Sequence, residues 1–261
     1  MPAFTPELRA EYQRLYDTVE VREHRRDDVA AIANELIASK PRYEVVAQRV
    51  GVPWQLVAVI HEMEASQKFT RHLHNGDPLG ARTVRVPAGH PRSGHPPFTW
   101  EESAADALRL KDLDDWGDWS VPGTLYQLER YNGWGYRNRE PEVRSPYLWS
   151  FCQHYTRGKY VADGEFSATA VSGQCGAAVL LRHLEQAGHP LPPRPQPVPL
   201  PDEFRSVRYD PDRYDATAEA LQRWLNQHPG VALVADGKAG RRTSNALHFV
   251  TGNYLPGDPR A

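Results

Sequence analysis

The chain has 261 residues, 40% of them hydrophobic and 25% charged, which is the composition of a globular protein with one medium and one small domain. A formal net charge of −2 argues against a nucleic-acid-binding surface, and no apolar run is long enough to span a membrane. The N-terminus lacks a basic start and an apolar core, so we expect no standard secretory signal. Cys152 and Cys175 are expected to be buried thiols, with one disulfide as the alternative.

Residues 5–66 are predicted to form a series of helices, because apolar residues recur at helical spacing in three stretches: 8–16, 29–36 and 43–50. Gly51 is expected to end the third helix, because glycine readily adopts the left-handed conformation of a helix end. Pro53 is placed to begin a fourth helix, which carries Glu64 close to its end.

Residues 74–97 are rich in Gly, Pro, Asp and Asn, which predicts a loop or a short β-hairpin with long turns. Helical patterns return in three later stretches: 99–113, 121–130 and 176–187. Thr99 and Glu102 have the spacing of a capping box, so we expect the first of these helices to begin there.

Proline occupies almost every second position from 190 to 201, which excludes a helix or the interior of a sheet. We therefore expect a linker at 190–208 between a domain of residues 1–189 and a small module of residues 209–261. The module is predicted to contain two helices around a turn. The fold class is accordingly mainly α, with a small β-hairpin in the first domain and a helical C-terminal module.

Glu64 is the most informative residue of the chain. Three apolar residues share its stripe at helical spacing: Trp54, Val57 and Ile60. Glu62 instead follows Gln55 and Ala58, on a face that is expected to be more polar. A carboxyl on an apolar stripe loses hydration, so its pKa rises and it becomes suited to act as a general acid near neutral pH. The alternative is an ordinary solvated glutamate at a helix end.

The segments that follow Glu64 carry further polar groups in a particular order. Asp77 and Thr83, with five residues between them, lie in the loop-like segment, and residues 131–136 read Tyr-Asn-Gly-Trp-Gly-Tyr. This order resembles the lysozyme superfamily of glycoside hydrolases and lytic transglycosylases. There a Glu ends a buried helix before a β-hairpin that lines a sugar cleft, phage-type lysozymes have an Asp and a Thr with this spacing, and a Tyr-Asn motif floors the transglycosylase cleft.

The resemblance has two departures. Ala65 stands where the transglycosylase members usually have Ser, and the gap from Glu64 to Asp77 is longer than in phage-type lysozymes. The role of Asp77 is therefore the less secure one, and the turn-forming sequence Asn-Gly-Asp-Pro offers a structural alternative for it.

The resemblance implies cleavage of a glycosidic bond, which requires a protonated carboxyl beside the leaving oxygen. Glu64 would donate that proton. Asp77 would orient or deprotonate a water molecule held by Thr83, which gives hydrolysis, the outcome slightly favoured. Alternatively, Glu64 would act as acid and then as base while the sugar's own hydroxyl displaces the leaving group, which gives transglycosylation.

Tyr131, Asn132 and Trp134 are expected to bind the sugar, because aromatic faces with polar edges suit pyranose rings. His61 is expected to pack on the same helix face and to form a hydrogen bond near Glu64. The sequence His-Glu-Met-Glu-Ala at 61–65 lacks the second His of the zinc-binding pattern His-Glu-x-x-His. We therefore expect no metal and no cofactor, with a metal-dependent cell-wall amidase or peptidase as an alternative.

The C-terminal module carries the most specific pattern of the chain. Residues 221–226 read Leu-Gln-Arg-Trp-Leu-Asn, and Asp236, Gly237, Gly240 and Thr243 follow. This pattern resembles the peptidoglycan-binding domain family, which implies that Asp236, Gly237 and Thr243 contribute to wall binding. Thr243 is also expected to cap the second helix. The alternative is that these residues only build the turn and the cap.

The resemblances together imply an enzyme, a lysozyme-type muramidase or a lytic transglycosylase. It would cleave the β-1,4 bond between N-acetylmuramic acid and N-acetylglucosamine while the module holds it on peptidoglycan. We expect a monomer that acts on the cell wall, either as a phage endolysin does or after non-classical export. The non-enzymatic alternative is a protein that only anchors to the wall.

Overall fold

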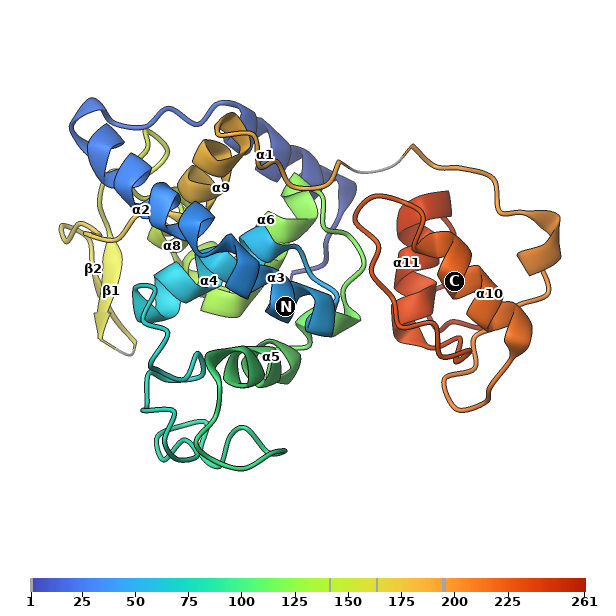
Figure 1. Ribbon diagram of the computed structural model, residues 1–261. Coiled ribbons are helices and arrows are strands. Elements are labelled where there is room, and N and C mark those ends of the chain that lie inside the picture. Colours follow the sequence, from blue (N-terminus) through green and yellow to red (C-terminus); the bar gives the residue numbers. More distant parts are fainter. Residues whose placement is uncertain (1, 141, 163, 194–195) are drawn as a thin grey trace.

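Helices dominate the structure, a computed structural model that describes residues 2–140, 142–162, 164–193 and 196–261 (Figure 1). In these residues the α-helices are α1 (Pro6–Asp17), α2 (Arg26–Ala38), α3 (Lys40–Val50), α4 (Trp54–Ala65), α5 (Trp100–Leu110), α6 (Val121–Asn132), α7 (Gly135–Arg139), α8 (Pro146–Trp149), α9 (Ala177–Gln186), α10 (Ala216–Leu225) and α11 (Arg241–Thr251). The 3₁₀ turns are η1 (Glu23–Arg25), η2 (Leu113–Asp115) and η3 (Asp202–Phe204). Strands β1 (Lys159–Ala162) and β2 (Glu165–Ser167) pair antiparallel. The expected mainly α fold with a small β-hairpin is confirmed.

Local sequence signals define the ends of several helices. The Thr5 side chain caps α1 at the residue before Pro6, and Gly51 ends α3 with a φ of 79°. The capping box of α5 is present, because the Thr99 hydroxyl accepts a hydrogen bond from the Glu102 amide while the Glu102 carboxylate accepts one from the Thr99 amide. The predicted boundaries at Gly51 and Thr99 are confirmed, because each depends only on residues within one turn.

Helix α4 runs through the middle of the first core and packs against α2, α3 and α9. Its residues are buried almost all round, from Gln55 to His61 and again at Met63. The expectation of a more polar face behind Glu62 is therefore wrong. Gln55 and Ala58, which share that face, are buried, and the Gln55 amide donates a hydrogen bond of 2.7 Å to the carbonyl oxygen of Pro190.

The segment between α4 and α5 is a long loop without regular strands; its one isolated bridge joins Arg71 and Pro78. The β-hairpin of the described residues lies elsewhere, at β1 and β2, where Tyr160 pairs with Phe166 and an irregularity in the register follows. The loop is thus ordered by side-chain hydrogen bonds and by contacts with α5 rather than by a β-ladder.

A second hydrophobic core lies in the C-terminal part, which is seen apart from the main helical body in Figure 1. It begins earlier in the chain than Tyr209, because Phe204 and Val207 are buried in it. The two parts touch through α11 and η2. The Arg242 guanidinium donates a 3.0 Å hydrogen bond to the Val50 carbonyl oxygen, and the Asn245 amide bonds the carbonyl of Asp115.

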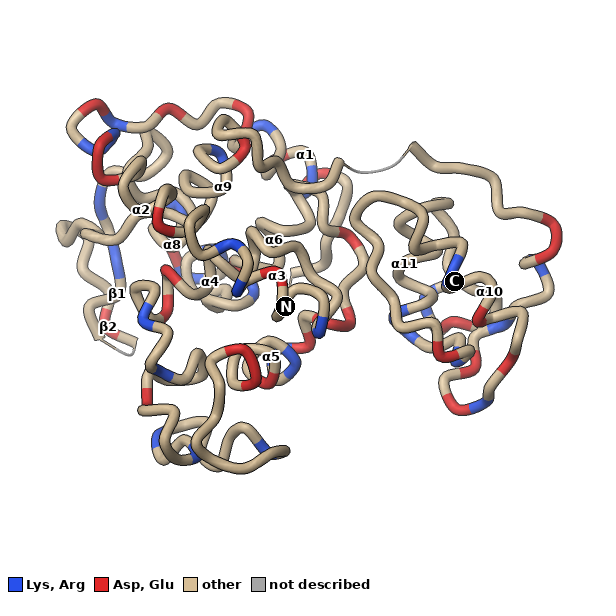
Figure 2. The backbone as a smooth tube through the Cα atoms, in the orientation of Figure 1, with Lys and Arg blue, Asp and Glu red and all other residues tan. Residues whose placement is uncertain are grey.

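Both cysteines, Cys152 and Cys175, are buried free thiols, as expected. Figure 2 shows acidic and basic residues interspersed over both parts of the chain, in line with the near-zero net charge. None of the helices in the described ranges combines the length and the hydrophobicity that crossing a bilayer requires.

Candidate active site

Glu64 lies one residue before the end of α4, where the chain turns through two residues with positive φ, Ser66 at 46° and Gln67 at 57°. The burial along the helix changes there: Val57 and Ile60 are fully buried, whereas Glu64 is exposed. Glu64 therefore lies where the apolar stripe of α4 leaves the core and reaches the protein surface.

Two side chains from other parts of the chain, Tyr147 and Lys111, act on the Glu64 carboxyl. Desolvation by the surrounding protein raises its pKa, and a hydrogen bond from Tyr147 and the charge of Lys111 partly oppose that rise. The Tyr147 hydroxyl donates to Oε1 at 3.1 Å from α8. The carboxyl is thus reached by solvent and yet surrounded by enough protein to raise its pKa. We call Glu64, Lys111, Tyr131 and Tyr147 the Glu64 site.

Tyr131 joins this group from the end of α6. Desolvation raises the pKa of the Tyr131 hydroxyl, and the negative charge of Glu64 adds to the rise. The Lys111 Nζ lies 5.2 Å from the centre of the Tyr131 ring. Tyr131 and Glu64, both selected from the sequence, therefore interact electrostatically in the fold. Lys111 and Tyr147 carried no recognisable signal in the sequence.

Asn132, which follows Tyr131 in the sequence, lines a cavity of about 360 Å³. Its lining includes one amide, two tyrosines and an arginine: Asn132, Tyr136, Tyr160 and Arg139. The two tyrosine rings meet edge to face with centres 5.2 Å apart, and strand β1 supplies Tyr160. Aromatic rings with amide and guanidinium donors are the groups that sugar sites use.

Trp134 and His61, both expected to bind substrate, have other surroundings. Trp134 is half-buried and packs on Tyr126 with ring centres 5.1 Å apart. His61 is 0% exposed, its ring centre lies 4.4 Å from that of Trp100, and its Nδ1 is 3.1 Å from the Tyr43 hydroxyl. Desolvation lowers its pKa to about 4. The expectation of His61 as a substrate-binding residue near Glu64 is corrected, because the ring is part of the core.

Asp77 is held by its own loop. Its Oδ2 accepts hydrogen bonds from the amides of Val84 at 2.9 Å and Arg85 at 3.1 Å, and its Oδ1 lies 2.7 Å from the Arg85 Nε. These amide hydrogen bonds, together with the Arg85 side chain, lower the pKa of Asp77 to about 2. Both oxygens are occupied, so the structure gives Asp77 the turn-bracing role that the sequence left open.

Thr83 braces the same loop. Its hydroxyl donates to the Pro87 carbonyl oxygen at 2.6 Å and accepts from the His90 amide at 2.9 Å. No hydrogen bond within the described ranges joins Thr83 or Asp77 to Glu64. The three residues expected to form one catalytic group thus belong to two separate hydrogen-bond systems.

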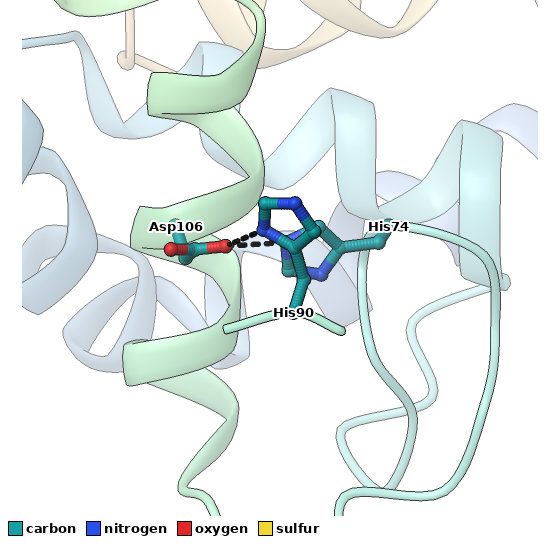
Figure 3. A group of neighbouring side chains, drawn as sticks. All are labelled: His74, His90 and Asp106. Atoms are coloured by element: carbon teal, nitrogen blue, oxygen red, sulfur yellow. Dashed lines mark hydrogen bonds and ion pairs between the residues drawn. The ribbon is translucent and has the colours of Figure 1, made fainter. Parts of the chain in front are cut away.

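Three histidines dock this loop onto α5. His72 Nε2 donates to the Ala81 carbonyl oxygen at 2.8 Å, so its Nδ1 accepts from the Ser103 hydroxyl at 2.7 Å. His74 and His90 both contact the carboxylate of Asp106 (Figure 3). Within the part of the chain that the structure describes, His74, His90 and Asp106 are the one group of three or more such side chains that lie close enough together to bind a metal ion. The His-Glu-x-x-His pattern considered in the sequence analysis does not include any of these residues.

The predicted binding residues of the C-terminal module surround the buried side chain of Gln222. Its Nε2 donates to Asp236 Oδ1 at 2.9 Å and to Thr243 Oγ1 at 3.0 Å, and its Oε1 accepts from the Gly237 amide at 2.8 Å. Gly237 has a φ of 70°, and a Cβ there would lie 2.5 Å from the ring of Tyr214. Glycine is therefore required at this turn.

Thr243 does not cap α11, because the helix starts at Arg241 with Gly240 as its N-cap. The Thr243 hydroxyl instead bonds to Gln222 and the Lys238 carbonyl oxygen. A cavity of about 220 Å³ borders this turn, with Asp236 and Thr243 in its wall and Asp115 of the first part on its far side.

Comparisons with protein-family models, with curated proteins and with solved structures found no match to this chain.

Proposed function

We propose that this protein cleaves the glycan strands of peptidoglycan at the β-1,4 bond between N-acetylmuramic acid and N-acetylglucosamine. Glu64 is the general acid, and the C-terminal module holds the enzyme on the wall. The observation that carries the proposal is the position of Glu64: a carboxyl with a raised pKa, open to solvent, oriented by the Tyr147 hydroxyl at 3.1 Å.

The Glu64 site contains the groups that this chemistry needs. A protonated carboxyl donates to the bridging oxygen, and Tyr147 selects one orientation of that carboxyl through its hydrogen bond to Oε1. Lys111 limits the rise in pKa, so the carboxyl also serves as a base once it has lost its proton. The cavity lined by Asn132 supports the proposal, because Asn132 is the sequence neighbour of Tyr131, which belongs to the Glu64 site.

We propose that Glu64 performs both proton transfers. In the first, its carboxyl protonates the bridging oxygen, the bond from that oxygen to C1 of N-acetylmuramic acid breaks, and the N-acetylglucosamine side leaves with a free hydroxyl. In the second, the Glu64 carboxylate takes the proton of the sugar's 6-hydroxyl while that oxygen bonds to C1. This route needs a single carboxylate, and the engagement of both Asp77 oxygens within the loop favours it over hydrolysis.

The module supports a role in wall attachment through the cavity beside Asp236. Its wall carries both signs of charge, positive from Lys238, Arg241 and Arg242 and negative from Asp115 and Asp236. Peptidoglycan stem peptides carry carboxylates and an amino group, which such cations and carboxylates attract. The Gln222 hydrogen bonds keep the turn in place beneath this surface.

Clearing of purified peptidoglycan embedded in a gel tests the role of Glu64. Glu64→Gln should abolish clearing, whereas Glu62→Gln is the matched control: Glu62 lies on the same helix and also has a pKa raised by desolvation, but it accepts its hydrogen bond from Gln67. Equal clearing by wild type and Glu64→Gln would remove Glu64 from the mechanism. No clearing by any of the three proteins would favour a purely anchoring protein.

Mass spectrometry of the soluble products distinguishes the routes. Products with 1,6-anhydro ends, lighter by one water than their hydrolysed counterparts, are expected. Reducing ends would instead show hydrolysis. If the protein instead released peptides without glycan fragments, and a chelator abolished that release, the activity would be that of a metal-dependent amidase or peptidase.

A further inference from the structure

The strongest feature outside the Glu64 site is the group of His74, His90 and Asp106, in which two imidazoles converge on one carboxylate oxygen (Figure 3). Asp106 Oδ2 lies 2.9 Å from His74 Nε2 and 2.7 Å from His90 Nδ1. One candidate ligand atom from each residue lies within 4.8 Å of the other two. A tetrahedral Zn²⁺ ion requires ligand atoms about 3.3 Å apart, so the two short distances need to widen by only about 0.5 Å.

The chemistry of these donors fits a late first-row divalent ion. Two imidazole nitrogens and one carboxylate oxygen are ligands that Zn²⁺ and its neighbours prefer, whereas Mg²⁺ and Ca²⁺ favour oxygen alone. Three protein ligands leave one position of a tetrahedron for water.

Among the described residues, Asp106 forms no ion pair with a lysine or an arginine. The side chains of His74 and His90 are 0% and 6% exposed, and that of Asp106 is 22% exposed. Over the described ranges, the ion pairs of Asp106 are with these two histidines alone. A partly buried carboxylate without a lasting positive partner is costly, and a divalent ion would supply that charge together with bonds to all three side chains.

The position of the group also gives such an ion something to do. His74 and His90 lie in the long loop without regular strands, and Asp106 lies on α5, 32 residues beyond His74. The Thr83 hydroxyl accepts from the His90 amide and so fixes the backbone beside one ligand. An ion bound here would fasten the loop to the helix and stabilise the folded chain, because the ligands are assembled only in the folded state.

We propose that His74, His90 and Asp106 bind one divalent transition-metal ion, Zn²⁺ foremost, which fastens the loop between α4 and α5 to α5. The sequence led us to expect no metal, because residues 61–65 lack the second His of the zinc-binding pattern; the proposed ligands lie outside that segment. The site is structural and separate from Glu64, so metal binding does not depend on glycan cleavage.

The test uses the full chain without a polyhistidine tag, freed of metal by a chelator and then titrated with ZnCl₂ by calorimetry. One ion per chain is expected, with a rise in melting temperature. His90→Gln and Asp106→Asn should each weaken Zn²⁺ binding at least about tenfold and remove most of that rise. His95→Gln is the matched control, because His95 lies in the same loop but is exposed and outside the group, and it should bind as wild type does.

Co²⁺ provides a readout on the wild type alone, should a variant fail to fold. Tetrahedral coordination gives intense visible absorption bands, whereas loose six-coordinate binding at a surface gives weak ones. Absence of Zn²⁺ binding by the wild type, weak Co²⁺ bands, or full binding by a folded Asp106→Asn would each overturn the proposal. Glycan cleavage is read separately by product analysis, so either proposal can fail while the other stands.

Discussion

Two carboxylates, Glu64 at the end of α4 and Asp77 in the following loop, were expected to share one reaction, and the fold gives them opposite environments. Among the described residues, the Glu64 carboxyl accepts one hydrogen bond, from the Tyr147 hydroxyl, and desolvation raises its pKa. Asp77 accepts hydrogen bonds from two backbone amides and from the Arg85 side chain, and its pKa is lowered to about 2. Desolvation with one hydrogen bond raises the pKa of Glu64, whereas three N–H groups directed at Asp77 lower its pKa, and this difference separates the acid from the loop brace.

The largest expected effect is that of Glu64→Gln, which should lower the rate of glycan release by about 100- to 10,000-fold because the proton donor is lost. The melting temperature should change little, since the side chain is exposed. The measurement is the initial rate of soluble product formation, with Asp77→Asn assayed alongside. If a folded Asp77→Asn lost as much activity, the division between acid and loop brace would be wrong.

Tyr147→Phe should lower the rate by about tenfold, because it removes the hydrogen bond that orients Glu64. The same bond lowers the pKa of Glu64, so its loss should raise that pKa further. Cleavage requires the protonated carboxyl and declines as the pH rises through this pKa. The alkaline limb of the rate–pH profile should therefore move to higher pH in the variant, and a shift to lower pH would contradict the assignment.

Asp77→Asn should lower the melting temperature by a few degrees at neutral pH, because the loop loses its ionised acceptor. The pKa of Asp77 in the folded protein is depressed to about 2, below the ordinary value of 3.8. Its stabilisation is therefore present above pH 3.8 and lost as the pH falls toward 2. The gap in melting temperature between the two proteins should narrow over that interval, and a constant gap would mean that charge is not involved.

Asp236→Asn should have the smallest effect, a few-fold weaker retention on purified cell walls with an unchanged rate on soluble glycan fragments. Asp236 resembles Asp77 in having its pKa lowered on balance: desolvation acts to raise it, but the amide of Lys238 and the side chain of Gln222 outweigh that effect. It differs in being exposed beside a cavity. Co-sedimentation measures retention, and Asp212→Asn, an exposed carboxylate outside that cavity, is the control. Unchanged retention would leave Asp236 as a turn residue only.

The sequence predicted the elements whose ends depend on nearby residues. Gly51 ends α3, and the Thr99 capping box starts α5. The two-helix module and its Asp-Gly turn were likewise readable, since Gly237 needs its left-handed conformation for a local reason. Thr243 was misplaced as a cap because its hydroxyl serves Gln222 instead.

Side-chain environment was decided only in three dimensions. Glu64 could be selected from the spacing of its helix, but Tyr147 lies 83 residues away in the chain and only the packing of α8 brings it within 3.1 Å. His61 has the same helical context and became a core residue, because Trp100 and Tyr43 close over it. Helix boundaries arise from contacts within a few residues, whereas the protonation state of a carboxyl and the assembly of a ligand set depend on groups that distant segments contribute.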